Sequence, residues 1–370
     1  MLVKLKDIAT FINGRAYLMP ELQNAGKYRI VRVGNFSGKD EWFYSDMELD
    51  PEKYCEKGDL LYKWACNFGP EIWKEEKAIY HYHIWKVIPD ESKVNKFYLY
   101  YKLAFMTPYW LSSTNGSTMV HITKEIMENK TIELPNIDTQ NKIAKILTRL
   151  DTQIERNETI VKRLQVLAQI IFYKFYGDNI KNFNGILSDL CSLPSGYSFK
   201  PSNYVENGKY KLITIKNVNG SFVDTKNVDT INDIPNNMKS FCYLNIGDIL
   251  VSLTGNVGRI SINSSLNCLL NQRVSKLIFK DNKYRLYIYL LLNSEYYQEK
   301  MKQMANGTSQ KNLSPLDVEK LRIFIPDNID EFYKFTKDIL DQLCLLNLSS
   351  TNLNSFKIKL LPLLINGQIQ

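Results

Sequence analysis

The chain has 370 residues, 44% of them hydrophobic and 23% charged, a balance that is typical of globular proteins and excludes a disordered chain. This length favours two domains over one core. The net charge of +8 suits an acidic partner such as nucleic acid without requiring one.

The six cysteines lie far apart and form no Cys-x-x-Cys pair. That spacing indicates neither a zinc ribbon nor a disulfide framework, so we expect a reducing, cytoplasmic location. Residues 1–14 lack a basic run followed by an apolar core, and no apolar stretch approaches the ~18 residues that would cross a bilayer. We therefore expect a chain that is neither exported nor embedded in a membrane.

Landmarks of the first half recur in the same order in the second half. Asp7 and Asn35 correspond to Asp189 and Asn217, each pair 182 positions apart, and both lie in segments of similar sequence. Further matches are Gly58-Asp59-Leu60-Leu61 with Gly247-Asp248-Ile249-Leu250 at an offset of 189, and Asn115-Gly116-Ser117 with Asn306-Gly307-Thr308 and Ile132-Glu133-Leu134-Pro135 with Ile323-Phe324-Ile325-Pro326 at 191. Chance would not keep this order, so we infer a gene duplication and two similar halves.

The first half opens with a domain over residues 1–136, where short β-branched and aromatic runs are broken by Gly and Asn. Residues 78–87 are predicted as a strand and residues 97–105 as a helix. In its middle, polar groups lie among Trp64, Trp73, Tyr82 and Trp85, a mixture that suits a groove-facing surface. The candidate DNA contacts are Lys63, Asn67, Lys74, His81 and His83.

Each candidate has a structural alternative. The tryptophans fit core packing better than base stacking, and Lys63 and Lys74 fit the outer face of a β-domain equally well. His81 and His83 would share one face of a strand, as two metal ligands do, but no Cys or acidic residue has a supporting spacing. We expect no metal site there.

A Gly-containing loop follows in each half. Asn115, Gly116, Ser117 and Thr118 in the first offer small residues and free backbone N–H groups to a phosphate or groove. The second loop has the corresponding residues Gly307, Thr308, Ser309, Gln310, Lys311 and Asn312. A plain turn is the alternative, but the duplication favours a functional loop.

A long helix is predicted over residues 137–180, because apolar residues alternate at spacings of four and three. The positions are Ile143, Leu147, Leu150, Ile154, Asn157, Val161, Leu164, Ala168, Ile171 and Phe175. Asn157 is the one polar member. One face of this helix must be buried.

The second domain spans residues 181–328, with a strand predicted over 273–279 and a helix over 284–304. Its middle differs strongly from that of the first domain, and it is dense in the amide, hydroxyl and guanidinium groups that read bases. The candidate DNA contacts are Ser252, Thr254, Asn256, Arg259, Asn271, Gln272 and Arg273. The Thr254-Gly255-Asn256-Val257-Gly258 segment lacks the Lys-Ser/Thr of a P-loop, so we expect a turn.

A second long helix is predicted over residues 329–370, since a shift of 192 positions carries most of the apolar ladder with it. The shifted positions are Phe335, Ile339, Gln342, Leu346, Ser349, Leu353, Phe356, Leu360 and Leu363. If the two helices pack antiparallel, Asn157 and Ser349 meet at the middle and fix the register of the pair. Pro362 should kink or end the second helix.

This duplicated order of motifs resembles the specificity subunits of type I restriction-modification systems. Gly69-Pro70-Glu71-Ile72-Trp73-Lys74 and His81-Tyr82-His83-Ile84-Trp85-Lys86 also resemble one recurrent class of that family's recognition domains. The resemblance covers essentially the whole chain. It implies an α+β fold with two β-rich target-recognition domains, each followed by a long helix, and the helices packed as an antiparallel coiled coil.

The resemblance also implies a function. Each domain would bind half of an asymmetric target in double-stranded DNA, the helices would fix the gap, and two methyltransferase subunits would dock on them. Restriction subunits are an optional further partner. Catalysis and its cofactors would belong to other chains, so we expect no cofactor and no activity from this chain alone.

The alternatives to this function are an enzyme and a scaffold. An enzyme is disfavoured, because the sequence has no Gly-rich cofactor loop after a strand, no Asn-Pro-Pro-aromatic run and no convincing Asp…Glu-x-Lys set. A duplicated scaffold that recruits partners without contacting DNA is the other alternative, and salt-sensitive DNA binding would exclude it.

Overall fold

The structure is a computed structural model that describes residues 1–38, 41–112, 122–307 and 311–369. It divides into two compact units, of which unit 1 comprises residues 1–152 and 354–370 and unit 2 comprises residues 153–353. The helices of the whole chain are α1 (Lys96–Ser112), α2 (Lys124–Glu128), α3 (Ile137–Tyr176), α4 (Arg285–Asn293), α5 (Glu295–Met304), α6 (Pro315–Glu319), α7 (Ile329–Thr336) and α8 (Ile339–Ile365).

Unit 1 holds two four-stranded sheets in the orders β4-β3-β8-β5 and β2-β9-β6-β7, together with the pair β1-β10. The pairing of β3 with β8 is parallel and the other pairings are antiparallel. The strands are β1 (Leu2–Lys4), β2 (Ala9–Asn13), β3 (Tyr28–Val31), β4 (Phe43–Ser45), β5 (Tyr54–Cys55), β6 (Leu60–Lys63), β7 (Gly69–Ile72), β8 (Ala78–Tyr80), β9 (Ile84–Pro89) and β10 (Thr131–Glu133).

Unit 2 repeats this topology with shorter strands. Its sheets have the orders β14-β13-β18-β15 and β17-β16-β19, with the pairs β12-β20 and β11-β21, and β13 runs parallel to β18 as β3 does to β8. The strands are β11 (Gly185–Ile186), β12 (Cys191–Ser192), β13 (Tyr210–Ile213), β14 (Thr230–Ile231), β15 (Tyr243–Leu244), β16 (Ile249–Ser252), β17 (Ile260–Ile262), β18 (Cys268–Leu270), β19 (Val274–Lys276), β20 (Ile278–Phe279) and β21 (Arg322–Ile323).

The sequence landmarks of the duplication are hydrogen-bonding groups of this shared frame. The Asn35 side chain accepts the Arg32 N–H at 2.9 Å, and the Asn217 side chain accepts the Thr214 N–H at 2.9 Å. Asp59 and Asp248 each accept a backbone N–H and pair with a lysine, at 2.7 Å to Lys86 and 2.6 Å to Lys276. The predicted duplication is therefore a duplication of structure.

α3 buries the predicted ladder. All ten positions from Ile143 to Phe175 are buried or half-buried. In unit 1, Ile143 and Leu147 share a core with Leu364 and Ile365 of α8. In unit 2, Ala168 and Phe172 of α3 share a core with Leu340 and Leu343 of α8.

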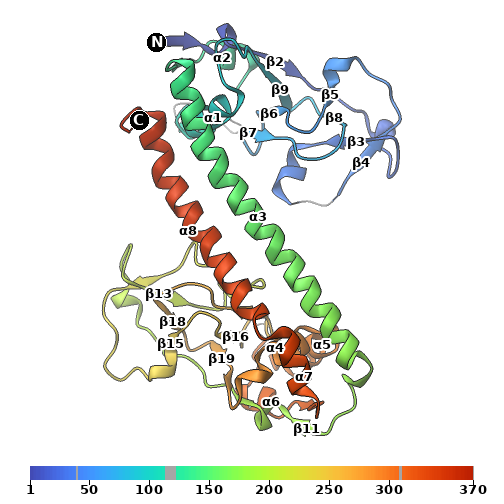
Figure 1. Ribbon diagram of the computed structural model, residues 1–370, viewed down its shortest axis with the longest axis vertical. Coiled ribbons are helices and arrows are strands. Elements are labelled where there is room, and N and C mark those ends of the chain that lie inside the picture. The colour runs from blue at the N-terminus through green and yellow to red at the C-terminus, as the bar shows by residue number, and fades with distance from the viewer. Residues whose placement is uncertain (39–40, 113–121, 308–310, 370) are drawn as a thin grey trace. The chain divides into compact units, whose positions relative to one another are not determined.

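α3 and α8 lie side by side and antiparallel in each unit (Figure 1). In unit 1, Lys357 donates to Asp151 at 2.5 Å, and Asp151 also accepts the Tyr101 hydroxyl at 2.6 Å. In unit 2, the Asn157 amide donates to Ser349 Oγ at 3.2 Å, and Phe175 contacts Phe335 of α7 at 6.2 Å between ring centroids. Residue numbers thus fall along α8 as they rise along α3.

The second long helix departs from its prediction in two ways. It is interrupted by a turn at Lys337 and Asp338; of the two outcomes expected at Pro362, a kink or an end, the helix does not end there but runs on to Ile365. Its buried face is also rotated. Ile339, Leu346, Leu353 and Leu360 are covered as expected, but the alternate predicted positions Phe335, Gln342, Ser349, Phe356 and Leu363 are exposed, and Leu343, Ser350, Lys357 and Leu364 are covered instead. Phe335 is exposed on α7, before the interruption, so the buried face already differs from the prediction there.

Candidate nucleic-acid interface

Two connections and one crossing segment meet at an edge of each unit; we call the two connections the edge loops. In unit 1 they are the β6–β7 connection (64–68) and the β8–β9 connection (81–83), joined by a bond from Trp64 N to the His83 carbonyl at 3.1 Å. The crossing segment carries Gly14 and Arg15 in unit 1 and Gly196 and Tyr197 in unit 2, and in unit 1 Tyr82 N donates to its Arg15 carbonyl at 3.0 Å. Backbone bonds of this kind fix where the side chains of the edge loops point.

Unit 2 builds its edge with the same bonds. Its edge loops are residues 253–259, between β16 and β17, and residues 271–273, between β18 and β19. Leu253 N donates to the Arg273 carbonyl at 3.0 Å, and Gln272 N donates to the Tyr197 carbonyl at 3.0 Å. His81, Tyr82 and His83 therefore correspond in place to Asn271, Gln272 and Arg273.

The crossing segment passes unusually close to the edge loops. A Cβ on Gly14 would lie 2.3 Å from the carbonyl oxygen of Tyr80, and one on Gly196 would lie 2.2 Å from that of Leu270. Only glycine permits this approach. The two glycines are 182 positions apart, so the offset of the duplication could have revealed them, although our sequence analysis did not single them out.

Asn67 and Asn256 occupy equivalent places in the two units. Each is exposed and follows a residue with left-handed backbone, Cys66 (φ 61°) or Gly255 (φ 74°). The Asn67 amide donates to Ser37 Oγ at 3.0 Å. An exposed amide on a geometrically fixed turn is suited to pairing with a base edge.

Lys63 is not at the surface that the sequence predicted. It is 4% exposed, donates to Glu71 at 2.7 Å and lies over the ring of Phe36. β6 is buried on both faces, so its last side chain points into the unit. Lys74 is exposed. Trp73 and Trp85 are buried, which confirms that they pack in the core.

The sequence predicted the two histidines of unit 1 on a strand. They lie instead in the short connection between β8 and β9. Their ring centroids are 4.9 Å apart, and the exposed Tyr82 contacts both rings. Burial, reinforced by His83 and Arg32, lowers the pKa of His81 to about 4. His81 is thus neutral at physiological pH and can both donate and accept a hydrogen bond.

Arg32 was missed by the sequence analysis. It is exposed, its guanidinium lies 5.1 Å from the centre of the Phe43 ring, and its charge reaches His81. It comes two residues after Ile30 and three before Asn35, so its place in a duplicated landmark was the available signal.

The polar residues of unit 2 divide into buried and exposed sets. Ser252 and Thr254 are buried: Ser252 Oγ donates to the Asn256 carbonyl at 2.6 Å, and Thr254 Oγ1 donates to Asn312 at 3.0 Å. Asn271 is half-buried. Exposed residues are Asn256, Arg259, Gln272, Arg273, Gly307 and Lys311. The predicted turn at 254–258 is confirmed.

A surface hollow of about 540 Å³ brings several of these residues together. Thr254, Gln272, Arg273 and Asn312 line it. Gly255 N donates to the Lys311 carbonyl at 2.9 Å, which ties the 311–313 segment to the edge loop. Asn115, Gly116, Ser117, Thr118 and His121, and Thr308, Ser309 and Gln310, lie outside the described residues.

Among residues 1–38, 41–112, 122–307 and 311–369, no group of three His, Cys, Asp or Glu side chains is placed to hold a metal ion. Within the same ranges no helix is long and apolar enough to cross a membrane.

Similarity to a known family identifies the protein that carries these two edges. The model of the type I restriction modification DNA specificity domain matches residues 1–166 and again residues 184–354. The chain belongs to this family. It is a non-catalytic specificity subunit, part of a type I restriction-modification complex, and its function is DNA target recognition, so the scaffold alternative is wrong.

Individual relatives of this specificity subunit agree. It is 26% identical over 342 residues to the type I restriction enzyme MjaVIII specificity subunit of Methanocaldococcus jannaschii, covering 85% of this chain and 80% of that one. It is 22% identical over 383 residues to the EcoBI specificity subunit of Escherichia coli, covering 91% and 78%. The crystal structure of a type I system S subunit from M. genitalium shares the fold, with a TM-score of 0.68 at 15% identity over 98% of this chain and 95% of that one.

Proposed function

We propose that this specificity subunit binds an asymmetric, interrupted target in double-stranded DNA, with each unit contacting one half. The observation that carries the proposal is the contrast between a shared frame and different edge loops. The same backbone bonds present His81, Tyr82 and His83 in unit 1 but Asn271, Gln272 and Arg273 in unit 2. Side chains with different donors and acceptors recognise different bases.

The contacts divide by chemistry. Base contacts fall to Asn67, His81 and His83 in unit 1 and to Asn256, Gln272 and Arg273 in unit 2. Arg32, Lys74, Arg259 and Lys311 are exposed cations suited to phosphates. Ser252, Thr254 and Asn271 support the loops, and Lys63 is excluded because its ammonium group is buried against Glu71.

The domain organisation proposed is two recognition domains at residues 1–136 and 181–328, with helical segments at 137–180 and 329–370. The helices would set the gap between half-sites, and the bond between Asn157 and Ser349 supports a role in their register. Two methyltransferase subunits are the proposed protein partners, with restriction subunits as an optional addition. The six cysteines are free thiols, which supports a cytoplasmic location.

Methylome sequencing tests this function. A host would express this chain with its neighbouring methyltransferase gene and be compared with the same host lacking the chain. We expect a methylated motif with two different halves separated by unspecified bases, present only with the chain. An unchanged methylome despite complex formation would contradict the proposal.

A further inference from the structure

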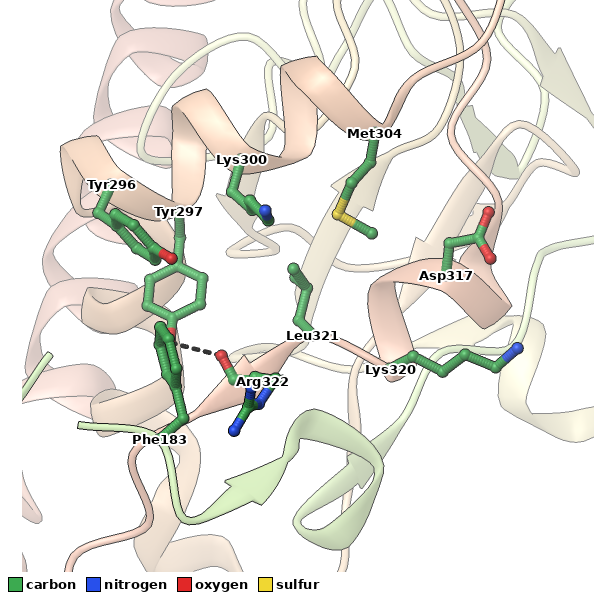
Figure 2. Close-up of a pocket in the computed structure, with 9 residues that line it drawn as sticks. All are labelled: Phe183, Tyr296, Tyr297, Lys300, Met304, Asp317, Lys320, Leu321 and Arg322. Atoms are coloured by element: carbon green, nitrogen blue, oxygen red, sulfur yellow. Dashed lines mark hydrogen bonds between the residues drawn. The ribbon is translucent and has the colours of Figure 1, made fainter. Parts of the chain in front are cut away.

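Unit 2 contains a pocket of about 480 Å³ between α5, α6 and β21 (Figure 2). Tyr297, Lys300 and Met304 come from α5, and Leu321 and Arg322 lie opposite them. The volume falls in the ~300–1,000 Å³ range of ligand sites. No contact of the edge loops described above involves these residues.

The interior of the pocket is apolar. Leu321 is 3% exposed, Tyr297 is fully buried, and Met304 is half-buried beside them. The Tyr297 hydroxyl donates to the Arg322 carbonyl at 2.9 Å, so its polar end is satisfied and its ring faces the pocket as hydrocarbon. Such a floor suits an apolar side chain, because a bare phosphate has no apolar surface to bury against it.

The rim of the pocket is positively charged. Lys300, Lys320 and Arg322 are exposed, and within the described ranges none of them has an ion pair. Asp317 is the one acidic residue among the lining residues. The pocket therefore attracts negative charge at its mouth while it offers hydrocarbon inside.

The aromatic rings at one end favour a peptide over a nucleotide. Phe183 and Tyr296 stack on each other with centroids 6.1 Å apart. Arg322 lies over the Phe183 ring at 5.4 Å, and Lys181 lies over the Tyr296 ring at 5.3 Å. Because each ring already contacts another ring and a cation, little aromatic face remains for a base.

The cations are not required by the shared frame. At the offset of 191, Tyr109, Asn129 and Thr131 stand where unit 2 has Lys300, Lys320 and Arg322. Thr131 and Arg322 have equivalent places, since each pairs with the strand that opens its unit. At these three positions, all within the described residues, unit 1 has neutral side chains, so the three cations are particular to unit 2.

We propose that this pocket binds an acidic peptide segment of a protein partner, with one apolar side chain of that segment inserted between Met304 and Leu321. The contact is made on unit 2 and has no counterpart on unit 1, so it distinguishes the two halves of the chain for a partner. The proposal rests on the proposed function for the presence of other subunits.

Site-specific photo-crosslinking in the assembled complex with the neighbouring methyltransferase tests it. Benzoylphenylalanine replaces Met304, and mass spectrometry identifies the crosslinked segment. We expect a partner segment that contains acidic residues around an apolar residue. The same probe at Lys302, an exposed position of α5 that does not line the pocket, should not give this crosslink. A crosslink to DNA, to a segment without acidic residues, or none at all would overturn the proposal.

Charge reversal provides a second test, in which the probe at Met304 is the same in every variant. Lys300→Glu with Arg322→Glu should lower the crosslink yield at least fivefold, whereas Lys302→Glu should leave it unchanged. An unchanged yield in the double variant would overturn the role of the cations. Failure of the proposed function would appear differently, as loss of the interrupted methylation motif with the unaltered chain.

Discussion

The edges of the two units are built on one frame and carry different side chains. Asp59 with Lys86 and Asp248 with Lys276 are matched pairs, and the crossing glycines make the same close approach. At the edge itself the imidazoles of unit 1 stand where unit 2 has an amide and a guanidinium. The comparison teaches that the frame and the proposed recognition chemistry are encoded by separate residues, which lets one change while the other is kept.

The largest effect is expected where the frame itself is altered. Gly14→Ala and Gly196→Ala each place a Cβ less than 2.5 Å from a backbone carbonyl, so each should lower the free energy of unfolding by about 3 kcal/mol. Because the frame is shared, the two losses should be similar. Thermal or urea denaturation measures them.

Gly220→Ala serves as the matched control, since its Cβ would meet only the Phe222 carbonyl oxygen at 3.9 Å. It should change stability by less than about 0.5 kcal/mol. If Gly14→Ala behaves like Gly220→Ala while Gly196→Ala does not, the two crossings are not equivalent.

A smaller effect should separate the units by pH. The pKa of His81 is about 4 against an ordinary 6.5, first because of burial and then because of His83 and Arg32. The unfolded chain takes up this proton near pH 6.5, so the stability that neutral His81 provides is present above that pH and is lost as pH falls toward 4. His81→Asn, which introduces the residue that unit 2 has at this place, should remove that loss.

Melting temperature at pH 7.5 and at pH 5.5 measures this difference. The drop between the two pH values should be smaller by about 3 °C in His81→Asn than in the unaltered chain. Asn271→Ala in unit 2 changes no titratable group and should leave the drop unchanged. An equal fall in melting temperature in the unaltered chain and in His81→Asn would contradict the lowered pKa of His81.

The smallest effect is expected for a phosphate contact. Lys311→Ala should weaken binding to every DNA sequence alike, by about tenfold or less, and reduce the slope of log affinity against log salt by about 1. Lys334→Ala, an exposed lysine on α7, should leave both unchanged. Fluorescence anisotropy over a salt series gives the slope. A change in preference among sequences would instead assign Lys311 to a base.

Much of the fold followed from the sequence because its signals are periodic or duplicated. The ladder from Ile143 to Phe175 predicted the buried face of α3, and the offsets of 182 and 191 predicted two similar units. The face of α8 was harder. The shift of 192 positions placed Gln342 and Ser349 on its buried face, but both are exposed and Leu343 is covered instead.

The candidate interface was predictable in its region but less so in its individual residues. Asn67 and Asn256 are exposed, but Ser252 and Thr254, which the sequence analysis grouped with Asn256, are buried. Burial of Lys63 could not be inferred, because alternation along β6 gives no sign that both faces are covered. The place of His81 depends on a turn that the apparent strand over residues 78–87 concealed.

Selection from a randomised DNA library tests most directly whether the two edges recognise different halves of one target. Asn67 and Asn256 stand at equivalent places, and loss of one amide contact costs about 1–3 kcal/mol of discrimination. Methylation of the library by complexes with the unaltered chain, Asn67→Ala and Asn256→Ala would be sequenced. We predict that each variant relaxes preference in one half only, and in opposite halves. Relaxation of the same half by both variants, or of neither, would contradict the account.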